Sequence, residues 1–328
     1  MEAIMAFKTP PLTTTEAKDV RRVGFEIEFT GLTIGDATQI LQKVFGGELE
    51  QKSAVEYVLH TPEYDKFKVE LDWEFLKNTA LEAKVKDDGH EWVDFLHQLA
   101  LSVVPLEIVS PPFPIDKLEK LDALIPALRD AGAKGTDDSV VAAFGVHINP
   151  ELPSLDVQTV HSYLQAFGLL QWWLNEAHDV NLARKISPYI QLYSEDYVEL
   201  LLDKTYQDMD ALIDDYLLHN PSRNRALDML PLFAFIDEEK VNNAVKDSKV
   251  NQRPTFHYRL PDCLIENTNW SFAMSWNIWY LVEALAADTK ALDFLSRRFK
   301  EMSLPLIGVK RSDWVKEVSQ WIKSRELG

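Results

Sequence analysis

The 328-residue chain has one cysteine and few glycines, and these shortages exclude several kinds of site. Because Cys263 stands alone, we expect no internal disulfide and no structural zinc cluster, and a reducing cytosol fits. With only 12 glycines, no G-x-G-x-x-G follows a predicted strand, and no G-x-x-x-x-G-K-S/T occurs. This argues against dinucleotide-binding and P-loop folds. The G-x-S-x-G elbow of hydrolases and the H-E-x-x-H helix of zinc proteases are also missing.

Basic residues are scarce too, with 34 against 52 acidic residues and a net charge of −18. This imbalance argues against a broad surface for nucleic acid or for an anionic membrane. A local arginine pocket with a metal ion can nevertheless bind the phosphates of a nucleotide. No run of 18 or more apolar residues predicts a membrane span, and residues 1–20 lack the basic-then-apolar order of a signal peptide. We therefore expect a soluble, cytoplasmic protein, and its oligomeric state stays open.

The order of apolar and polar residues predicts an α+β fold. Strand-like runs occupy residues 23–29, 54–60, 67–73, 103–110, 140–148 and 255–260, and helical patterns occupy 36–45, 91–101, 115–131, 155–179, 195–219, 270–300 and 313–325. Because strands and helices do not alternate strictly, we expect a largely antiparallel sheet and a helical C-terminal half. Prolines and threonines in residues 1–20 indicate a flexible leader. No repeat or linker divides residues 21–328, which we expect to form a single domain.

The strand predicted at residues 23–29 contains two glutamates within an apolar run. Side chains alternate along a strand, so Glu26 and Glu28 project from one face while Phe25 and Ile27 enter the core. Two neighbouring carboxylates on an apolar strand repel each other and are costly to desolvate. A divalent cation bound to their oxygens offsets that cost. A solvated edge strand without any metal is the alternative interpretation of this pair.

More polar residues lie on the faces or at the ends of predicted strands, namely Asp72, Glu107, His147, His257 and Arg259. A lone buried glutamate often pairs with an arginine, and a lone buried histidine is usually a satisfied core residue. Their shared placement is what indicates a site. Carboxylates and one imidazole on one sheet face suit Mg²⁺ or Mn²⁺, with phosphate oxygens and water completing the shells. Arg223 and Arg225 either face this site or are surface charges.

Six short segments in the same order resemble the amidoligase family of carboxylate–amine ligases, relatives of glutamine synthetase and glutamate–cysteine ligase. The segments are Gly24-Phe25-Glu26-Ile27-Glu28, Asp72 after Lys68-Val69-Glu70-Leu71, Glu107-Ile108-Val109-Ser110-Pro111-Pro112, Gly145-Val146-His147-Ile148-Asn149, Arg223 and Arg225 before Ala226-Leu227, and Phe256-His257-Tyr258-Arg259. Each segment is short, and their order over residues 24–259 makes the resemblance specific.

The resemblance implies a curved, largely antiparallel sheet with helices on one face, as in the catalytic fold of glutamine synthetase and glutamate–cysteine ligase. The concave face is then expected to bind ATP and two divalent cations, Mg²⁺ or Mn²⁺. In that family a substrate carboxylate attacks the γ-phosphate of ATP, and an amine displaces the resulting acyl phosphate. We therefore expect small-molecule or peptide carboxylate and amine substrates, and no nucleic acid or membrane partner.

The resemblance also implies the metal ligands. Glu26 and Glu28 resemble the paired carboxylate ligands, Glu107 resembles a further ligand, and His147 resembles the histidine that ligates a metal near the phosphates. The last strand of the family usually reads Glu-Phe-Arg, and this chain has His257 in the glutamate position. An imidazole ligand therefore replaces a carboxylate, which we expect to alter the metal preference or to weaken the second ion.

The same resemblance implies the catalytic and cofactor-binding residues. Arg259 resembles the strand arginine that steadies the transferring phosphoryl group, which needs positive charge on its equatorial oxygens. Asp72 is expected to position the substrate or a metal-bound water. Arg223 or Arg225 is expected to hold a substrate carboxylate in a two-pronged grip, with Arg223 also near the cofactor and Arg225 catalytic. The family commonly has a small residue after Asp72, whereas this chain has Trp73, so the substrate pocket is expected to differ.

Two other functions are compatible with these residues. A metal-dependent phosphotransferase or hydrolase would use the same carboxylates without forming an amide, and it would release ADP without any amine. A nucleotide-binding protein that has lost turnover would bind ATP and give no product, and His257 in place of the usual glutamate is the feature that favours it.

Overall fold

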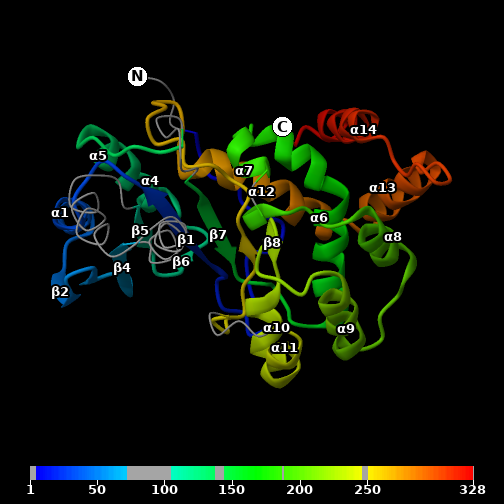
Figure 1. The fold of residues 1–328 in the computed structure, drawn as a ribbon, viewed down its shortest axis with the longest axis horizontal. Coiled ribbons are helices and arrows are strands. Elements are labelled where there is room, and N and C mark those ends of the chain that lie inside the picture. The colour runs from blue at the N-terminus through cyan, green and yellow to red at the C-terminus, as the bar shows by residue number, and fades with distance from the viewer. Residues whose placement is uncertain (1–4, 72–104, 137–143, 187, 246–249, 328) are drawn as a thin grey trace, which may run out of the picture.

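The computed structural model describes residues 5–71, 105–136, 144–186, 188–245 and 250–327. Within these residues nine strands form one sheet in the order β2-β3-β4-β5-β1-β7-β9-β8, with β6 beside β1 (Figure 1). All of the strand pairings are antiparallel. The strands are β1 (Arg22–Phe29), β2 (Glu48–Ser53), β3 (Glu56–His60), β4 (Lys66–Leu71), β5 (Leu106–Val109), β6 (Phe113–Pro114), β7 (Val146–Pro150), β8 (Leu227–Asp228) and β9 (His257–Tyr258). The predicted mixed fold with a large antiparallel sheet is confirmed.

The helices make up most of the chain after β7 (Figure 1). They are α1 (Ile34–Phe45), α4 (Glu119–Asp122), α5 (Leu124–Asp130), α6 (Val157–Ala177), α7 (Leu182–Ile186), η1 (Pro188–Ile190), α8 (Glu195–Asp203), α9 (Met209–His219), α10 (Leu230–Ile236), α11 (Glu238–Ala244), α12 (Phe272–Ala286), α13 (Thr289–Met302) and α14 (Arg311–Ser324). The helix expected at residues 91–101 lies outside the described residues. Among the helices of the described ranges, none is both long enough and apolar enough to cross a membrane.

Two stretches predicted as single helices are each two shorter ones. Residues 115–131 contain α4 and α5, because Pro126 has no N–H to donate and is tolerated only in the first turn of a new helix. Residues 195–219 contain α8 and α9. Here the side chain of Asp208 accepts a hydrogen bond of 2.9 Å from the backbone N–H of Ala211 and so caps the second helix.

Strand β1 lies inside the sheet, with β5 paired on one side and β7 on the other. Its side chains alternate as predicted. The side chains of the apolar face are at most 1% exposed, and they belong to Val23, Phe25, Ile27 and Phe29. Glu26 and Glu28 project from the opposite face. The predicted strand is confirmed, and its interior position excludes the edge-strand interpretation.

Helices cover the apolar face of the sheet. The strand pairing places Phe25, Ile148 and Tyr258 side by side on that face. The ring of Phe272 in α12 lies 5.0 Å from the ring of Phe25, and the ring of Trp279 lies 4.9 Å from that of Tyr258. Helix α1 packs against β3 and β4, and the ring of Phe45 in α1 lies 4.6 Å from the ring of Phe67 in β4. The carboxylates of β1 therefore lie on the face that these helices leave uncovered.

Residues 5–20, which belong to the predicted leader, contact α12. The side chain of Phe7 is buried. The backbone N–H of Lys8 donates to Asn277 Oδ1 at 2.7 Å, and Trp276 Nε1 donates to the carbonyl of Lys8 at 2.8 Å. The flexibility expected of residues 1–20, and the single domain expected over residues 21–328, stay predictions.

Candidate active site

The polar face of the sheet gathers the predicted carboxylates and imidazoles. Directly opposite residues of neighbouring strands point to the same face. The pairing places Glu107 of β5 opposite Glu28, and His147 of β7 opposite Glu26. Glu26 is 7% exposed and His147 is 6% exposed, while Glu28 and Glu107 are half-buried. Three adjacent strands therefore bring four of the predicted residues together.

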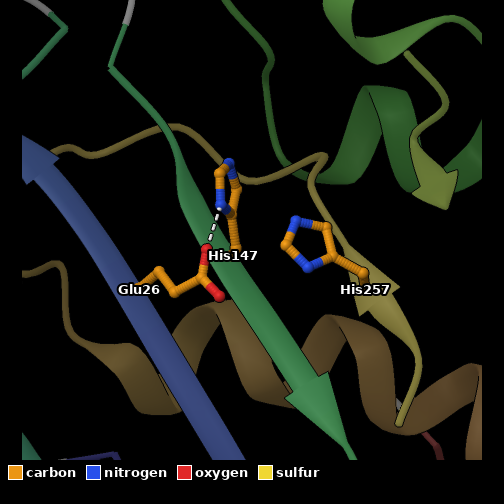
Figure 2. Close-up of side chains that lie close together, drawn as sticks. All are labelled: Glu26, His147 and His257. Carbon is orange, nitrogen blue, oxygen red and sulfur yellow. Dashed lines mark hydrogen bonds and ion pairs between the residues drawn. The ribbon is translucent and has the colours of Figure 1, made fainter. Parts of the chain in front are cut away.

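The ring of His147 lies between the two glutamates of β1. Its Nδ1 is 2.8 Å from Glu26 Oε2, and its Nε2 is 3.8 Å from Glu28 Oε1. Asn149 lies two residues further along β7, so it faces the same way, and its Nδ2 donates to Glu26 Oε1 at 2.9 Å. Figure 2 shows the Glu26–His147 contact with His257 beside it. Strands β1 and β7 therefore hold Glu26 and His147 in one arrangement.

Two groups of side chains on this face have the composition and spacing of a metal site. In each group the ligand atoms lie within 4.8 Å of one another. One group is Glu28, Glu107 and His147, and the other is Glu26, His147 and His257. Oxygen ligands with one imidazole suit Mg²⁺ or Mn²⁺. The first group is further oriented by the backbone N–H of Gly145, which donates to Glu28 Oε2 at 2.8 Å.

Arg253, in the segment before β9, contacts the second group. Its Nη1 donates to Glu26 Oε1 at 3.2 Å, and its Nη2 donates to His257 Nδ1. The rings of His147 and His257 lie 5.0 Å apart, measured between centroids. His257 Nε2 is buried and has no hydrogen-bond partner among the described residues.

These neighbours set the protonation of Glu26 and His257. Burial by itself would raise the pKa of the Glu26 carboxyl. His257, the hydrogen bond to His147 and the charge of Arg253 outweigh burial and hold that pKa well below its usual value. Burial lowers the pKa of His257 well below its usual value, despite the attraction of Glu26. Near neutral pH, Glu26 is therefore ionised and the His257 ring is neutral.

Arg259 lies two residues after His257 and provides positive charge next to the imidazoles. Its Nη1 donates to the backbone carbonyl of Arg223 at 3.0 Å, and its buried Nε has no partner among the described residues. Asp228 of β8 lies opposite His257. Burial raises the pKa of Asp228 to about 6, although the charge of Arg259 opposes that rise. An arginine with an unsatisfied buried N–H is suited to bind an anionic group.

The remaining predicted residues are placed as follows. Arg225 donates from Nε to Asn220 Oδ1 at 2.8 Å and from Nη1 to Gln191 Oε1 at 2.7 Å, so its guanidinium lies between these two amides. Arg223 contributes its backbone carbonyl to Arg259. Asp72 lies outside the described residues. The roles expected for Arg223, Arg225 and Asp72 stay predictions.

Three further residues of this face were not predicted from the sequence, namely Arg253, Asn149 and Glu70. Asn149 alternates with His147 along β7, and Glu70 of β4 lies directly opposite Glu107. The period of two along each strand is the signal that would have found both residues. Arg253 lies in an irregular segment without a period, so no sequence pattern places it beside Glu26.

Comparison with known proteins defines the family. Residues 19–281 match the family described as "Putative amidoligase enzyme". Because the match spans well over half of the chain, this protein belongs to that amidoligase family. The resemblance inferred from the six short segments is confirmed. No curated protein and no solved structure gives a significant match.

Proposed function

We propose that this chain is an ATP-dependent ligase that joins a carboxylate to an amine, acting on an amino acid or a peptide-like substrate. The observation that carries the proposal is the convergence of Glu28, Glu107 and His147 from three neighbouring strands, with ligand atoms within 4.8 Å of one another. The match of residues 19–281 to the amidoligase family supports the same activity.

The reaction proposed has two steps. A carboxylate oxygen of the substrate attacks the γ-phosphorus of ATP, the bond from that phosphorus to the β–γ bridging oxygen breaks, and ADP leaves with the electron pair. The amine nitrogen then attacks the carbonyl carbon of the acyl phosphate. The carbon–oxygen bond to phosphate breaks, phosphate leaves, and the nitrogen loses a proton. The result is an amide, ADP and phosphate.

Residues of the polar face fit the needs of this reaction. Glu28, Glu107 and His147 would hold Mg²⁺ or Mn²⁺, because they offer carboxylate oxygens and an imidazole nitrogen close together. When bound, the cation neutralises negative charge on phosphate oxygens. Arg259 would donate to the transferring phosphoryl group, and its buried Nε, which has no partner in the described part of the chain, supports this role. Arg223 and Arg225 are the candidates for holding substrate.

Calorimetric titration of a non-hydrolysable ATP analogue tests the binding part of the proposal. We expect binding to the wild type to require Mg²⁺, and affinity to fall about tenfold or more in Glu28→Gln, which removes a ligand charge. Glu48→Gln is the matched control, because Glu48 is an exposed residue of β2 in the same sheet. Its affinity should equal that of the wild type. Absence of binding to folded wild-type protein contradicts the proposal.

Release of ADP tests the reaction itself. We expect ADP to appear only when pools of both carboxylate and amine substrates are supplied, and amide formation to accompany it. Release of ADP without any amine would instead identify a phosphotransferase or hydrolase. Tight nucleotide binding with no product from any pool would identify a binding protein without turnover.

A further inference from the structure

The two candidate metal groups differ in whether their ligand atoms have electron pairs to offer. The difference arises from Arg253, which contacts the group of Glu26, His147 and His257. A guanidinium has five N–H donors and no acceptor. Each atom that it contacts must therefore supply an electron pair to it.

In the Glu26 group most electron pairs of the Glu26 carboxylate and the one lone pair of His257 are already engaged. Glu26 Oε2 accepts from His147 Nδ1 at 2.8 Å, and Oε1 accepts from Asn149 at 2.9 Å and from Arg253 at 3.2 Å. His257 Nδ1 accepts from Arg253 Nη2. A neutral imidazole has one lone pair in the ring plane and one N–H, so the proton of His257 is on Nε2. Neither nitrogen of His257 has a lone pair left for a cation.

The Glu28 group has the opposite arrangement. In the neutral tautomer of His147 whose Nδ1–H donates to Glu26, the lone pair is on Nε2, which lies 3.8 Å from Glu28 Oε1. These two atoms are too far apart for a hydrogen bond. A histidine that donates from one nitrogen to a carboxylate and offers the other to a metal is the usual pattern at metal centres. Glu26 has the position of that orienting carboxylate.

The charges agree with this assignment. Glu26 is buried, and the guanidinium of Arg253, whose side chain is 31% exposed, lies 3.2 Å from Glu26 Oε1. A divalent cation bound to Glu26 would lie next to this positive charge and would repel it. The Glu28 group has two half-buried carboxylates directly opposite each other. Like charges in that position are destabilising, and a cation relieves the repulsion.

We propose that Arg253 occupies the place of a second cation, so that the protein groups hold one divalent ion, on Glu28, Glu107 and His147. Glu26 then acts as a positioning residue that orients His147. The inference rests on the proposed function, because it assumes that the ligase uses a divalent cation. It departs from the sequence-based expectation of two ions with Glu26 as a direct ligand.

Titration with Mn²⁺ in the absence of nucleotide tests this count, with free Mn²⁺ followed by electron paramagnetic resonance. We expect one Mn²⁺ per chain in the wild type and two in Arg253→Met, which removes the charge and frees Glu26 and His257. Arg253→Lys keeps a positive charge and should still bind one. Arg298→Met, which removes an arginine from a half-buried ion pair between α13 and α14, is the matched control and should also bind one.

Two variants distinguish ligand from positioning residue. Glu28→Gln should weaken the single Mn²⁺ site and leave no second one. Glu26→Gln should keep one ion per chain and weaken its affinity by about 10–100-fold, as expected when a carboxylate that orients a metal-bound histidine is lost.

The outcomes separate this inference from the proposed function. Two Mn²⁺ ions per chain in the wild type overturn the inference and leave the ligase proposal standing, and this result does not depend on any variant folding. One ion in folded Arg253→Met also overturns it. No Mn²⁺ bound to folded wild-type protein, either with or without the ATP analogue, overturns both proposals. One ion in the wild type together with no ADP release under any condition overturns only the proposed function.

Discussion

Two clusters of buried charge lie on opposite faces of β1, and they differ in how completely they are hydrogen-bonded. On the helix-covered face, Arg21 and Glu283 of α12 are both 0% exposed and form two hydrogen bonds of 2.9 Å with each other. Tyr163 and Trp279 also donate to the Glu283 carboxylate, and Arg21 Nε donates to the carbonyl of Glu151 at 2.7 Å. The hydrogen bonds of this cluster are therefore closed, which means that other protein groups supply the partners of Arg21 and Glu283.

The cluster on the polar face is incomplete. Among the described residues, His257 Nε2, Arg253 Nε and Arg259 Nε are buried without a partner. Buried polar atoms are normally hydrogen-bonded, so unsatisfied ones need an explanation such as a ligand or an ion. The comparison indicates that burial and charge alone do not mark a functional site. We therefore expect the cluster with unsatisfied atoms to bind a ligand and the hydrogen-bonded cluster to stabilise the fold.

The largest expected effect is loss of stability from breaking the closed cluster. Glu283→Gln leaves the charge of Arg21 buried without its counter-ion, and we expect the free energy of unfolding to fall by about 3–5 kcal/mol. Urea denaturation measures the change. The matched control is Glu317→Gln, which breaks an ion pair whose side chains are 24% and 37% exposed. That control should cost less than about 1 kcal/mol. Equal losses in both variants would show that the Arg21–Glu283 cluster is not a special source of stability.

A smaller, pH-dependent effect on stability is expected from His178, a buried histidine at the C-terminal end of α6. His178 Nε2 contacts the hydroxyl of Tyr258 at 2.8 Å. Burial, together with the charge of Arg184, lowers the pKa of His178 to about 3. Between the ordinary value of 6.5 and about 3, the unfolded chain binds a proton that the folded chain does not. Stability therefore falls as the pH falls through this window, by about 2–3 kcal/mol near pH 4.5.

His178→Gln should remove that contribution. We expect a shallower decline of the free energy of unfolding between pH 6.5 and about 3 than in the wild type, whatever the cost of the substitution at neutral pH. Urea denaturation at a series of pH values gives the slope. His60→Gln, at an exposed histidine of β3 that lies 3.0 Å from Glu50, is the control and should change the slope less than His178→Gln does. Identical slopes for His178→Gln and the wild type would contradict the prediction.

The smallest expected effect is a gain in stability, and it comes from a substitution in the incomplete cluster on the polar face. Glu28 and Glu107 are like charges directly opposite each other. In a buffer with a chelator, we expect Glu28→Gln to raise the free energy of unfolding by about 0.2–1 kcal/mol, because it removes this repulsion. The same variant should weaken metal binding. A loss of stability greater than about 1 kcal/mol would show that Glu28 supports the fold rather than a ligand.

The sequence predicted much of this site because strands impose a strict period of two. Glu26, Glu28, Glu107, His147 and His257 were all inferred from polar residues within apolar strands, and the strand pairing brings them onto one face. The arginine that contacts Glu26 and His257 could not be predicted in the same way. Arg253 lies outside any strand, and only the folded chain brings it next to Glu26, which is 227 positions away.

The break between α8 and α9 escaped prediction for a related reason. Apolar residues continue at helical spacing across residues 195–219, so periodicity alone gives one long helix. The break depends on the cap provided by Asp208 and on the contact of Lys204 Nζ with Asp215 at 2.5 Å. Such side-chain contacts leave no periodic trace in the sequence.

The anchored guanidinium of Arg21 has a further consequence for folding. A strand with one apolar face and one charged face can pair out of alignment by a single residue, and such a slip exchanges its two faces. Phe25 would then face the site, and Glu26 would enter the core. Arg21 directly precedes β1 and binds Glu283 through both terminal nitrogens, so only one alignment satisfies this pair. The ion pair on the covered face thereby selects which residues reach the other face.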